Sequence, residues 1–231
     1  MHDAELFEQQ AFGVVNDYTN LFHRPIQDEA LAHLLDVAQE NHVSVVTPNV
    51  AHLLETLACL RQPRCILELG TAYGVSSYHI LKGLEAPAKF VTIDLVAERQ
   101  QVARAFLEEK GMCNRHDIIF CCDDFRAEGY LEALAKQYGP FDFVFMDAAK
   151  GQYAHLLTLL LPYLQDQGTL VFDNIFLNGW LIADAYPNHR QKTAFLRMKQ
   201  FLASIQTDER FSNVLLPLDD GVLVLVKRGA L

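Results

Sequence analysis

Hydrophobic and polar residues follow two different periodicities along this chain, and the change occurs near residue 62. Over residues 5–61 apolar side chains recur every three or four positions, as in LAHLLDVAQENH and VAHLLETLACLRQ. This spacing predicts amphipathic helices. Pro25 and Pro48 interrupt the pattern, which indicates two or three helices rather than one. We therefore predict a helical segment over residues 1–61 and a separate unit over residues 62–231.

Short apolar runs and helical stretches alternate after residue 62. The runs have the length of buried strands and read CILELG, FVTID, DIIFCC, FVFMD and TLVFD. The helical stretches are expected near residues 75–84, 97–110, 128–138, 152–164 and 189–206. Repeated strand–helix–strand units predict a parallel sheet with right-handed crossovers.

The end of the chain departs from that alternation. The runs NVLLPL and VLVLVK are joined only by the turn at residues 219–221, so these two strands must be antiparallel. We expect an α/β, Rossmann-like fold with a seven-stranded sheet, in which five strands are parallel and the last two form an antiparallel hairpin.

Composition and charge indicate a cytoplasmic protein without a membrane segment. The five cysteines include no CxxC pair, which favours reduced core thiols. No run approaches the roughly 18 apolar residues of a membrane span. The net charge of −10 comes mainly from residues 1–60, which hold nine acidic residues and one basic residue, Arg24. The remainder is nearly neutral, so it shows neither a basic RNA-binding footprint nor strong repulsion of RNA.

A glycine-containing turn follows the first predicted strand, in LELGTAYG. Gly70 and Gly74 allow the backbone to approach a ligand closely. A dinucleotide site would need GxGxxG, but Ala72 occupies the second glycine position. Glu68 suits S-adenosylmethionine instead, because this cofactor has cationic amino and sulfonium groups. Asp94 ends the next strand, where an acid can accept hydrogen bonds from both ribose hydroxyls.

The third predicted strand runs into an acidic pair. In enzymes that use S-adenosylmethionine, a residue at this place contacts the adenine. We align Asp124 and Phe125 with that position, and Asp123 stays open as the alternative.

Acidic and amide side chains end the next two strands. Asp147 closes FDFVFMD, and Asp173 and Asn174 close GTLVFDN. Because ligands bind outside the carboxyl ends of the strands in such sheets, we expect these three side chains to meet. Two carboxylates and one amide oxygen suit a hard cation such as Mg²⁺ or Mn²⁺. The sequence therefore predicts a divalent-metal site beside the cofactor turn.

These motifs, MDAAKGQY and FDNIFLNG together with VSVVTPNVAHLL, resemble the cation-dependent class I O-methyltransferases. That family includes catechol, caffeoyl-CoA and bacterial tRNA hydroxyuridine methyltransferases, and the resemblance covers about residues 42–228. It implies that Asp147, Asp173 and Asn174 bind the cation and that Lys150, with Asp147, is catalytic. The cofactor contacts that it implies, with those from the strand ends, are Val46, Glu68, Gly70, Ser76, Asp94, Asp124, Phe125 and Asp147.

The substrate is less well determined. The segments DAAKGQY, HRQKT–RMKQFL and LPLDDGVLVLVK resemble the tRNA enzymes, which implies methylation of wobble 5-hydroxyuridine to 5-methoxyuridine. A small catechol-type phenol stays open, because both acceptors offer a metal two adjacent oxygens. A non-catalytic cofactor-binding protein is the remote alternative.

Four residues outside the metal site are candidate substrate contacts. Arg190 and Arg197 share one face of the last predicted helix, and Lys192 lies on the opposite face. Trp180 stacks on a flat substrate or packs its own loop. We also expect a homodimer, with the acidic helical segment covering the site or a partner.

Overall fold

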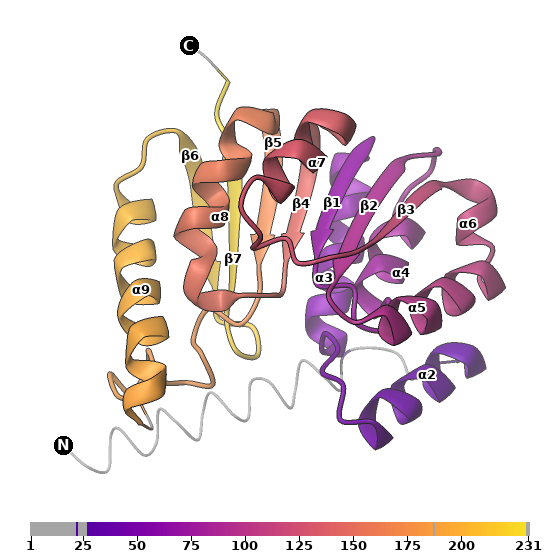
Figure 1. Ribbon diagram of the computed structural model, residues 1–231, viewed down its shortest axis with the longest axis horizontal. Coiled ribbons are helices and arrows are strands. Elements are labelled where there is room, and N and C mark those ends of the chain that lie inside the picture. The colour runs from indigo at the N-terminus through magenta and orange to yellow at the C-terminus, as the bar shows by residue number, and fades with distance from the viewer. Residues whose placement is uncertain (1–21, 23–26, 187, 230–231) are drawn as a thin grey trace.

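The computed structural model describes residues 22, 27–186 and 188–229 (Figure 1). Most of the first predicted helical region, residues 5–26, therefore lies outside the described residues. No helix in the described ranges is long and apolar enough to cross a membrane. The elements that position the site begin with α2 (Glu29–Glu40) and α3 (Pro48–Arg61).

The alternating strands and helices follow these two helices in the predicted order. Their bounds are β1 (Cys65–Leu69), α4 (Val75–Lys82), β2 (Lys89–Asp94), α5 (Ala97–Glu109), α6 (Met112–Arg115), β3 (Asp117–Cys122), α7 (Tyr130–Tyr138), β4 (Phe141–Met146), η1 (Lys150–Gln152), α8 (Tyr153–Leu160), η2 (Leu161–Tyr163), β5 (Leu164–Phe172), α9 (His189–Gln206), β6 (Phe211–Leu216) and β7 (Val222–Lys227).

The strands form one seven-stranded sheet in the order β3-β2-β1-β4-β5-β7-β6. The first five strands are parallel to one another. Strand β7 runs antiparallel to both β5 and β6. The predicted fold class is confirmed, including the C-terminal hairpin. Strand order reverses between β1 and β4, and in such sheets this is where a crevice opens at the carboxyl ends.

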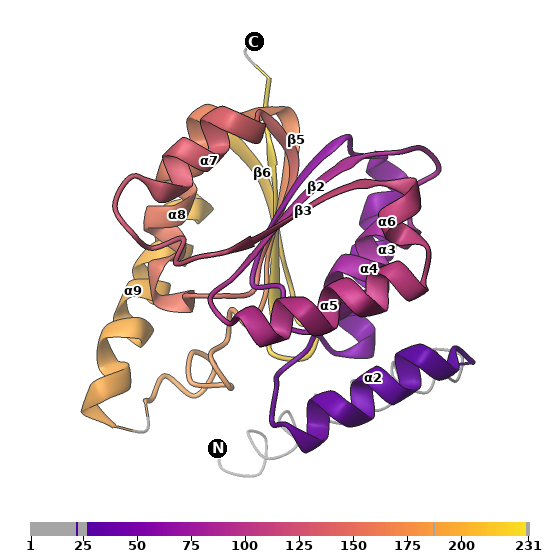
Figure 2. The same ribbon diagram turned by 45° about the vertical axis from the view of Figure 1, so that its right-hand side comes forward.

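Helices cover both faces of the sheet, as Figure 2 shows, with α7, α8 and α9 on one face and α3, α4 and α5 on the other. Two hydrophobic clusters correspond to these faces. Strand side chains alternate between them: Leu67 and Leu69 join one cluster and Ile66 joins the other. This alternation is the two-residue period of a strand buried on both sides.

Local sequence explains where the flanking helices begin. The side chain of Asp28 accepts a hydrogen bond from the Leu31 amide at 3.1 Å and caps α2. Thr47 caps α3 in the same way, and Pro48 occupies the first turn, where its missing N–H costs nothing. Asn188 caps α9 through the amide of Arg190.

Helices α2 and α3 do not form a core of their own. Leu34 from α2 and Leu54 from α3 are buried in the same cluster as Phe90 of β2 and Phe143 of β4. The described part of residues 1–61 therefore completes one face of the sheet. The division at residue 61 and the contact of this segment with a second copy stay predictions.

Candidate active site

Backbone hydrogen bonds extend the sheet past the ends of three neighbouring strands. The amide of Gly70 bonds to β2, that of Asp147 to β1 and that of Asp173 to β4, at 2.9, 3.0 and 3.0 Å. Each strand-end residue is thus held against the strand beside it. The three residues, far apart in the sequence, are placed along one edge of the sheet.

A cavity of about 580 Å³ opens along this edge. Seven aspartates line it: Asp94, Asp123, Asp124, Asp147, Asp173, Asp219 and Asp220. The basic residues in its wall are Arg99, Arg126 and Lys150, with His42 beside them. The cavity therefore has an excess of negative charge and suits cationic ligands.

The structure brings most of the predicted site residues to this cavity. Those that line it are Gly70, Asp94, Asp124, Phe125, Asp147, Lys150, Asp173 and Asn174. Those outside its lining are Val46, Glu68, Ser76, Trp180, Arg190, Lys192 and Arg197. The cofactor and substrate roles of both groups stay predictions.

The turn after β1 has the close backbone packing that its glycines suggested. Gly70 has φ of +105°, and a Cβ there would lie 3.2 Å from the carbonyl oxygen of Asp147. Asp94 stabilises the same turn, because its carboxylate accepts hydrogen bonds from the amides of Ala72 at 2.8 Å and Val96 at 2.9 Å. Asp94 therefore shapes the cavity floor as well as lining it.

Glu68 lies behind this turn rather than on the cavity wall. It is fully buried, and its carboxylate accepts hydrogen bonds from the hydroxyls of Ser76, Ser77 and Thr92. Burial raises its pKa to about 7, although the three hydroxyl donors oppose that shift. Glu68 thus links β1 to α4 and β2. The Ser76 hydroxyl donates its hydrogen bond to Glu68.

The acidic pair after β3 presents both members to the cavity, but their carboxylates are already engaged. Asp124 forms a two-point ion pair with Arg126, at 2.7 and 2.9 Å. Asp123 accepts a hydrogen bond from the Asp124 amide at 2.8 Å. Phe125 is buried and offers the cavity a flat apolar surface.

The carboxylates of Asp147 and Asp173, the two predicted ligands, are both buried and repel each other. Burial, and next the charge of Asp147, raise the pKa of Asp173 to about 7. Burial also raises the pKa of Asp147, against the charge of Lys150. Such a pair is unfavourable unless positive charge lies between the two groups. One lysine supplies a single positive charge for two carboxylates, so negative charge remains that a bound cation would offset.

The donor set therefore fits a hard divalent cation. No cluster of three or more His, Cys, Asp or Glu side chains that could hold a metal occurs in the part of the chain that the structure describes. The amide oxygen of Asn174 would be the third ligand of the predicted set, and this ligand set stays a prediction. Two carboxylates with one amide oxygen remain an oxygen-only set, which suits Mg²⁺ or Mn²⁺.

Lys150 lies among these oxygens. Its Nζ atom is 3.5 Å from Oδ1 of Asp147 and donates a hydrogen bond to Oδ1 of Asn174. Tyr153 holds the segment in place, since its hydroxyl lies 3.0 and 2.9 Å from the carbonyl oxygens of Met146 and Asp173. The lysine is thus positioned by both strand ends.

Sequence reasoning missed the contribution of the β6–β7 turn. The sequence pattern predicts only that residues 219–221 connect two strands. In the structure Asp219 accepts hydrogen bonds from the side chains of Thr47 and Asn49, which ties α3 to the cavity. Asp220 binds the amides of Asn178 and Gly179, at 2.8 and 3.1 Å. The predicted hairpin does not say which strand it joins; the observed pairing of β7 with β5 brings both acids to the cavity that Asp173 also lines.

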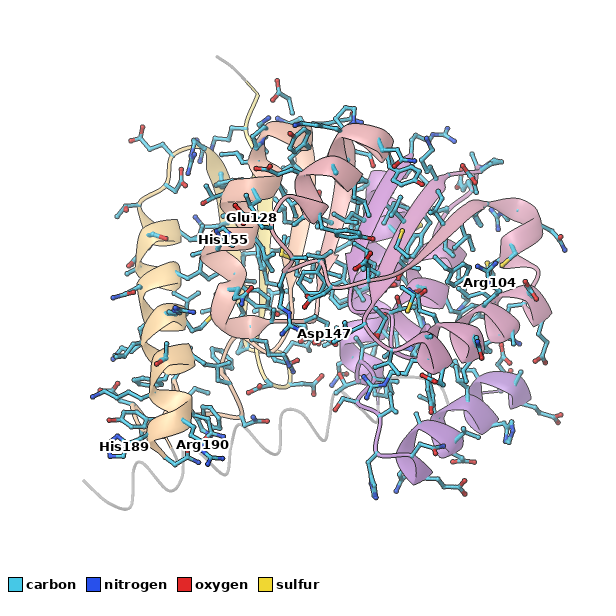
Figure 3. The ribbon with its side chains drawn as sticks, viewed as in Figure 1. Arg104, Glu128, Asp147, His155, His189 and Arg190 are labelled. Atoms are coloured by element: carbon cyan, nitrogen blue, oxygen red, sulfur yellow. The ribbon has the colours of Figure 1, made fainter. Side chains whose placement is uncertain are left out.

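The candidate substrate residues lie farther out. Trp180 is partly buried and packs against the core, and a stacking role for it stays a prediction. Arg190, Lys192 and Arg197 are exposed on α9. Figure 3 labels Arg190 at the first turn of that helix and Asp147 at the sheet edge.

Several solved structures have this fold and match nearly the whole length of the chain. An O-methyltransferase from Bacillus cereus, crystallised with SAH, superposes with a TM-score of 0.73 at 23% identity, covering 93% of this chain and 97% of its own. The O-methyltransferase TomG from Streptomyces achromogenes, crystallised with SAM, gives a TM-score of 0.74 at 24% identity, covering 96% of this chain and 99% of its own.

Sequence comparison identifies the family. A protein from Mycobacterium sp. (strain JLS), provisionally named an O-methyltransferase, is 30% identical over 87% of this chain and 87% of its own length. The model of the O-methyltransferase family matches residues 24–228, which include every predicted ligand and catalytic residue. The chain therefore belongs to the O-methyltransferase family, whose enzymes transfer a methyl group to an oxygen atom.

Proposed function

We propose that this protein transfers the methyl group of S-adenosylmethionine to a hydroxyl that has a second oxygen beside it, with the help of a divalent cation. The observation that carries this proposal is the pair of buried carboxylates at adjacent strand ends, Asp147 and Asp173, with Lys150 paired to Asp147. The cation would be held by these two carboxylates and Asn174. It would lower the pKa of an acceptor hydroxyl and fix its direction.

The cofactor proposal is supported by the acid-rich cavity beside the glycine turn. Asp94 lies at the end of β2, where its carboxylate can accept hydrogen bonds from ribose hydroxyls. Phe125 offers a surface for the adenine. Structural neighbours that were crystallised with SAH or SAM add support, since they share this fold over nearly the whole chain.

Lys150 is proposed to accept the proton of the acceptor hydroxyl or to stabilise the resulting oxyanion. In methyl transfer the acceptor oxygen forms a bond to the methyl carbon as the carbon–sulfur bond breaks, and the sulfur keeps that electron pair. The acceptor must lose its proton. A neutral Lys150 amine can accept this proton, whereas an ammonium can only stabilise the oxyanion.

For the acceptor we propose 5-hydroxyuridine at the wobble position of tRNA, which would yield 5-methoxyuridine. Its 5-hydroxyl and neighbouring O4 supply two adjacent oxygens. The segment DAAKGQY and the exposed bases on α9 support this acceptor. Arg190 and Arg197 lie on one face of that helix and are available to phosphates.

A small catechol-type phenol is the second candidate. It provides the same pair of oxygens. It is favoured by a structural neighbour, TomG, an O-methyltransferase involved in tomaymycin synthesis. The site chemistry does not distinguish the two acceptors, because both present the same arrangement to the cation.

One experiment decides between them. The purified protein is incubated with S-adenosylmethionine labelled in the methyl group, Mg²⁺, and either tRNA that contains 5-hydroxyuridine or a simple catechol. Labelled 5-methoxyuridine in the digested tRNA would support the RNA proposal. Efficient labelling of catechol with none in the RNA would replace it by the small-molecule reading.

A further inference from the structure

A second cavity, of about 640 Å³, adjoins the candidate active site and has the opposite charge. It lies between the segment η1–α8 and one face of α9. It shares Arg126 and Lys150 with the first cavity. Its polar and charged lining consists of Arg126, Lys150, Gln152, Tyr153, His155, Arg197, Gln200 and Ser204. Among the described residues its wall holds no aspartate or glutamate, whereas seven aspartates line the first cavity.

Arg197 is the free cation of this wall. It is exposed and takes part in none of the ion pairs found between described residues. Gln200 lies three positions farther along α9 and lines the same cavity, with the buried ring of Phe201 below them. His155 of α8, labelled in Figure 3, lines the same cavity as Arg197 and Gln200.

Arg126 adds donors from the opposite side of this cavity. Asp124 occupies its Nε and Nη2 atoms, but the side chain is still 46% exposed. An arginine has five N–H groups, so donors remain for an anion. Lys150 is similar, being engaged by Asp147 yet 35% exposed. Two arginines, a lysine and a histidine thus surround a space without any carboxylate in its wall.

This local charge is unusual for the molecule. The chain carries a net charge of −10, most of it in residues 1–60, and the first cavity is lined by seven aspartates. The second cavity, whose only charged side chains among the described residues are basic, can hold an anionic ligand. Arginine is suited to phosphate in particular, because its planar guanidinium donates two parallel hydrogen bonds to phosphate oxygens.

We propose that this second cavity binds a phosphate group of the acceptor substrate, with Arg197 as its principal ligand. The acceptor then spans both cavities, with its reacting hydroxyl beside Lys150 and its phosphate beyond it. This inference rests on the proposed methyl transfer and adds the requirement that a good acceptor is anionic. The phosphate belongs to the RNA backbone or to a small phenolic phosphate, and the acceptors tested below separate these sources.

Two matched acceptor pairs test the proposal in the full-length protein. One pair is 5-hydroxyuridine and its 5′-monophosphate; the other is 3,4-dihydroxybenzyl alcohol and its phosphate ester. In the wild type the phosphorylated member of the preferred pair should have a kcat/KM at least about tenfold higher, mainly through KM, as one charge-assisted contact predicts. The pair that shows this preference identifies the source of the phosphate.

Arg197→Glu should reduce that ratio to about one, through a higher KM for the phosphorylated acceptor. Lys136→Glu is the matched control, because Lys136 is exposed in the last turn of α7 and lines neither cavity. The control changes the net charge equally and should keep the wild-type preference. Equal kcat/KM for both members in the wild type would overturn the phosphate site and leave the methyl-transfer proposal standing.

A binding measurement gives a result even if neither pair is methylated. Pyrophosphate is titrated calorimetrically into the metal-free protein. Binding that Arg197→Glu abolishes and Lys136→Glu retains would support the phosphate site independently of the reaction. The same pyrophosphate affinity in the wild type and Arg197→Glu, or no binding to the wild type, would overturn it.

Discussion

The Nζ atom of Lys150 lies 3.5 Å from Oδ1 of Asp147 at the end of β4. The same ammonium donates to Asn174 Oδ1, so one lysine contacts two of the three proposed cation ligands. A cation bound by these oxygens would compete with the lysine for them. Lys150 would then be free to interact with the acceptor, so cation binding and the action of the lysine would be coupled.

Removal of the metal should abolish methyl transfer. Excess EDTA is expected to stop turnover, and Mg²⁺ or Mn²⁺ should restore it. Asp173→Asn should lower activity at least about 100-fold, because one of the two carboxylate ligands is lost. In metal-free buffer the same variant should melt at a higher temperature, since it removes one of two buried charges of like sign. Full turnover in excess chelator would sink the metal proposal.

Lys150→Ala should lower kcat by about 10²–10⁴-fold if the lysine acts on the acceptor proton. The deficit should shrink at high pH, where the acceptor ionises unaided. Lys150→Arg is the control, because it keeps the positive charge but cannot act as a base at these pH values. Pre-steady-state rates and Mg²⁺ affinity distinguish the roles: a variant that loses only cation affinity would identify Lys150 as a structural ion-pair partner.

Asp94→Ala should weaken binding of S-adenosylmethionine by about 1.5–3 kcal/mol, if its carboxylate receives both ribose hydroxyls. Titration calorimetry measures this directly. Because Asp94 also holds the amides of Ala72 and Val96, Asp94→Asn is the better-matched change: it keeps the side-chain shape while removing the charge. Unchanged affinity in both variants would mean that the ribose lies elsewhere.

Glu68 should make the stability of the protein depend on pH. Its pKa rises from an ordinary 4.5 to about 7 on folding, because the carboxyl is fully buried. The folded state therefore holds the proton more tightly than the unfolded chain. The corresponding stability is fully present below pH 4.5 and is lost as pH rises through about 7.

The size of this effect follows from the shift, which corresponds to about 3 kcal/mol. Urea denaturation at several pH values should show the free energy of unfolding falling between pH 5 and 8. Glu68→Gln, which does not titrate, should make this dependence shallower, and Asp173, whose pKa is also raised to about 7, should account for part of what remains. If both proteins respond to pH in parallel, other groups are responsible. Cofactor titration of the same variant tests whether Glu68 also serves the bound ligand.

Arg190→Glu should impair methylation of tRNA and spare a small catechol. Arg190 is exposed at the start of α9 and lines neither cavity, so only an extended polyanion can reach it from the site. The apparent affinity for tRNA should also fall as salt rises, because phosphate contacts release counterions. An identical salt dependence in the wild type and Arg190→Glu would exclude this arginine from the RNA contact.

Much of the fold could be read from local patterns. Strand and helix identity follows from periods of two and of three to four residues, and the observed α9, His189–Gln206, has the bounds that its pattern predicted. The antiparallel hairpin followed from a connection too short for any other arrangement. The proposed ligands were found because polar residues directly after buried strands have few structural reasons to be there.

Packing shows the neighbours of Glu68 and Trp180, which side-chain identity left open. Glu68 has the chemistry of a ligand contact, but in the fold three hydroxyls from two other elements surround it. Trp180 has a ring suited to stacking, and the loop turns it against the core. Such assignments depend on neighbours distant in the sequence, which no local period encodes.

The order of strands and helices, the acidic and amide residues at the strand ends and the glycine turn are all visible in the sequence, because each depends on residues close together in the chain. Which charges lie near one another depends on the folded structure. It brought Asp219 and Asp220 to the acidic cavity through the pairing of β7 with β5. It also set Arg197 across from His155. Electrostatic interactions act through space, so their partners appear only when the chain is folded.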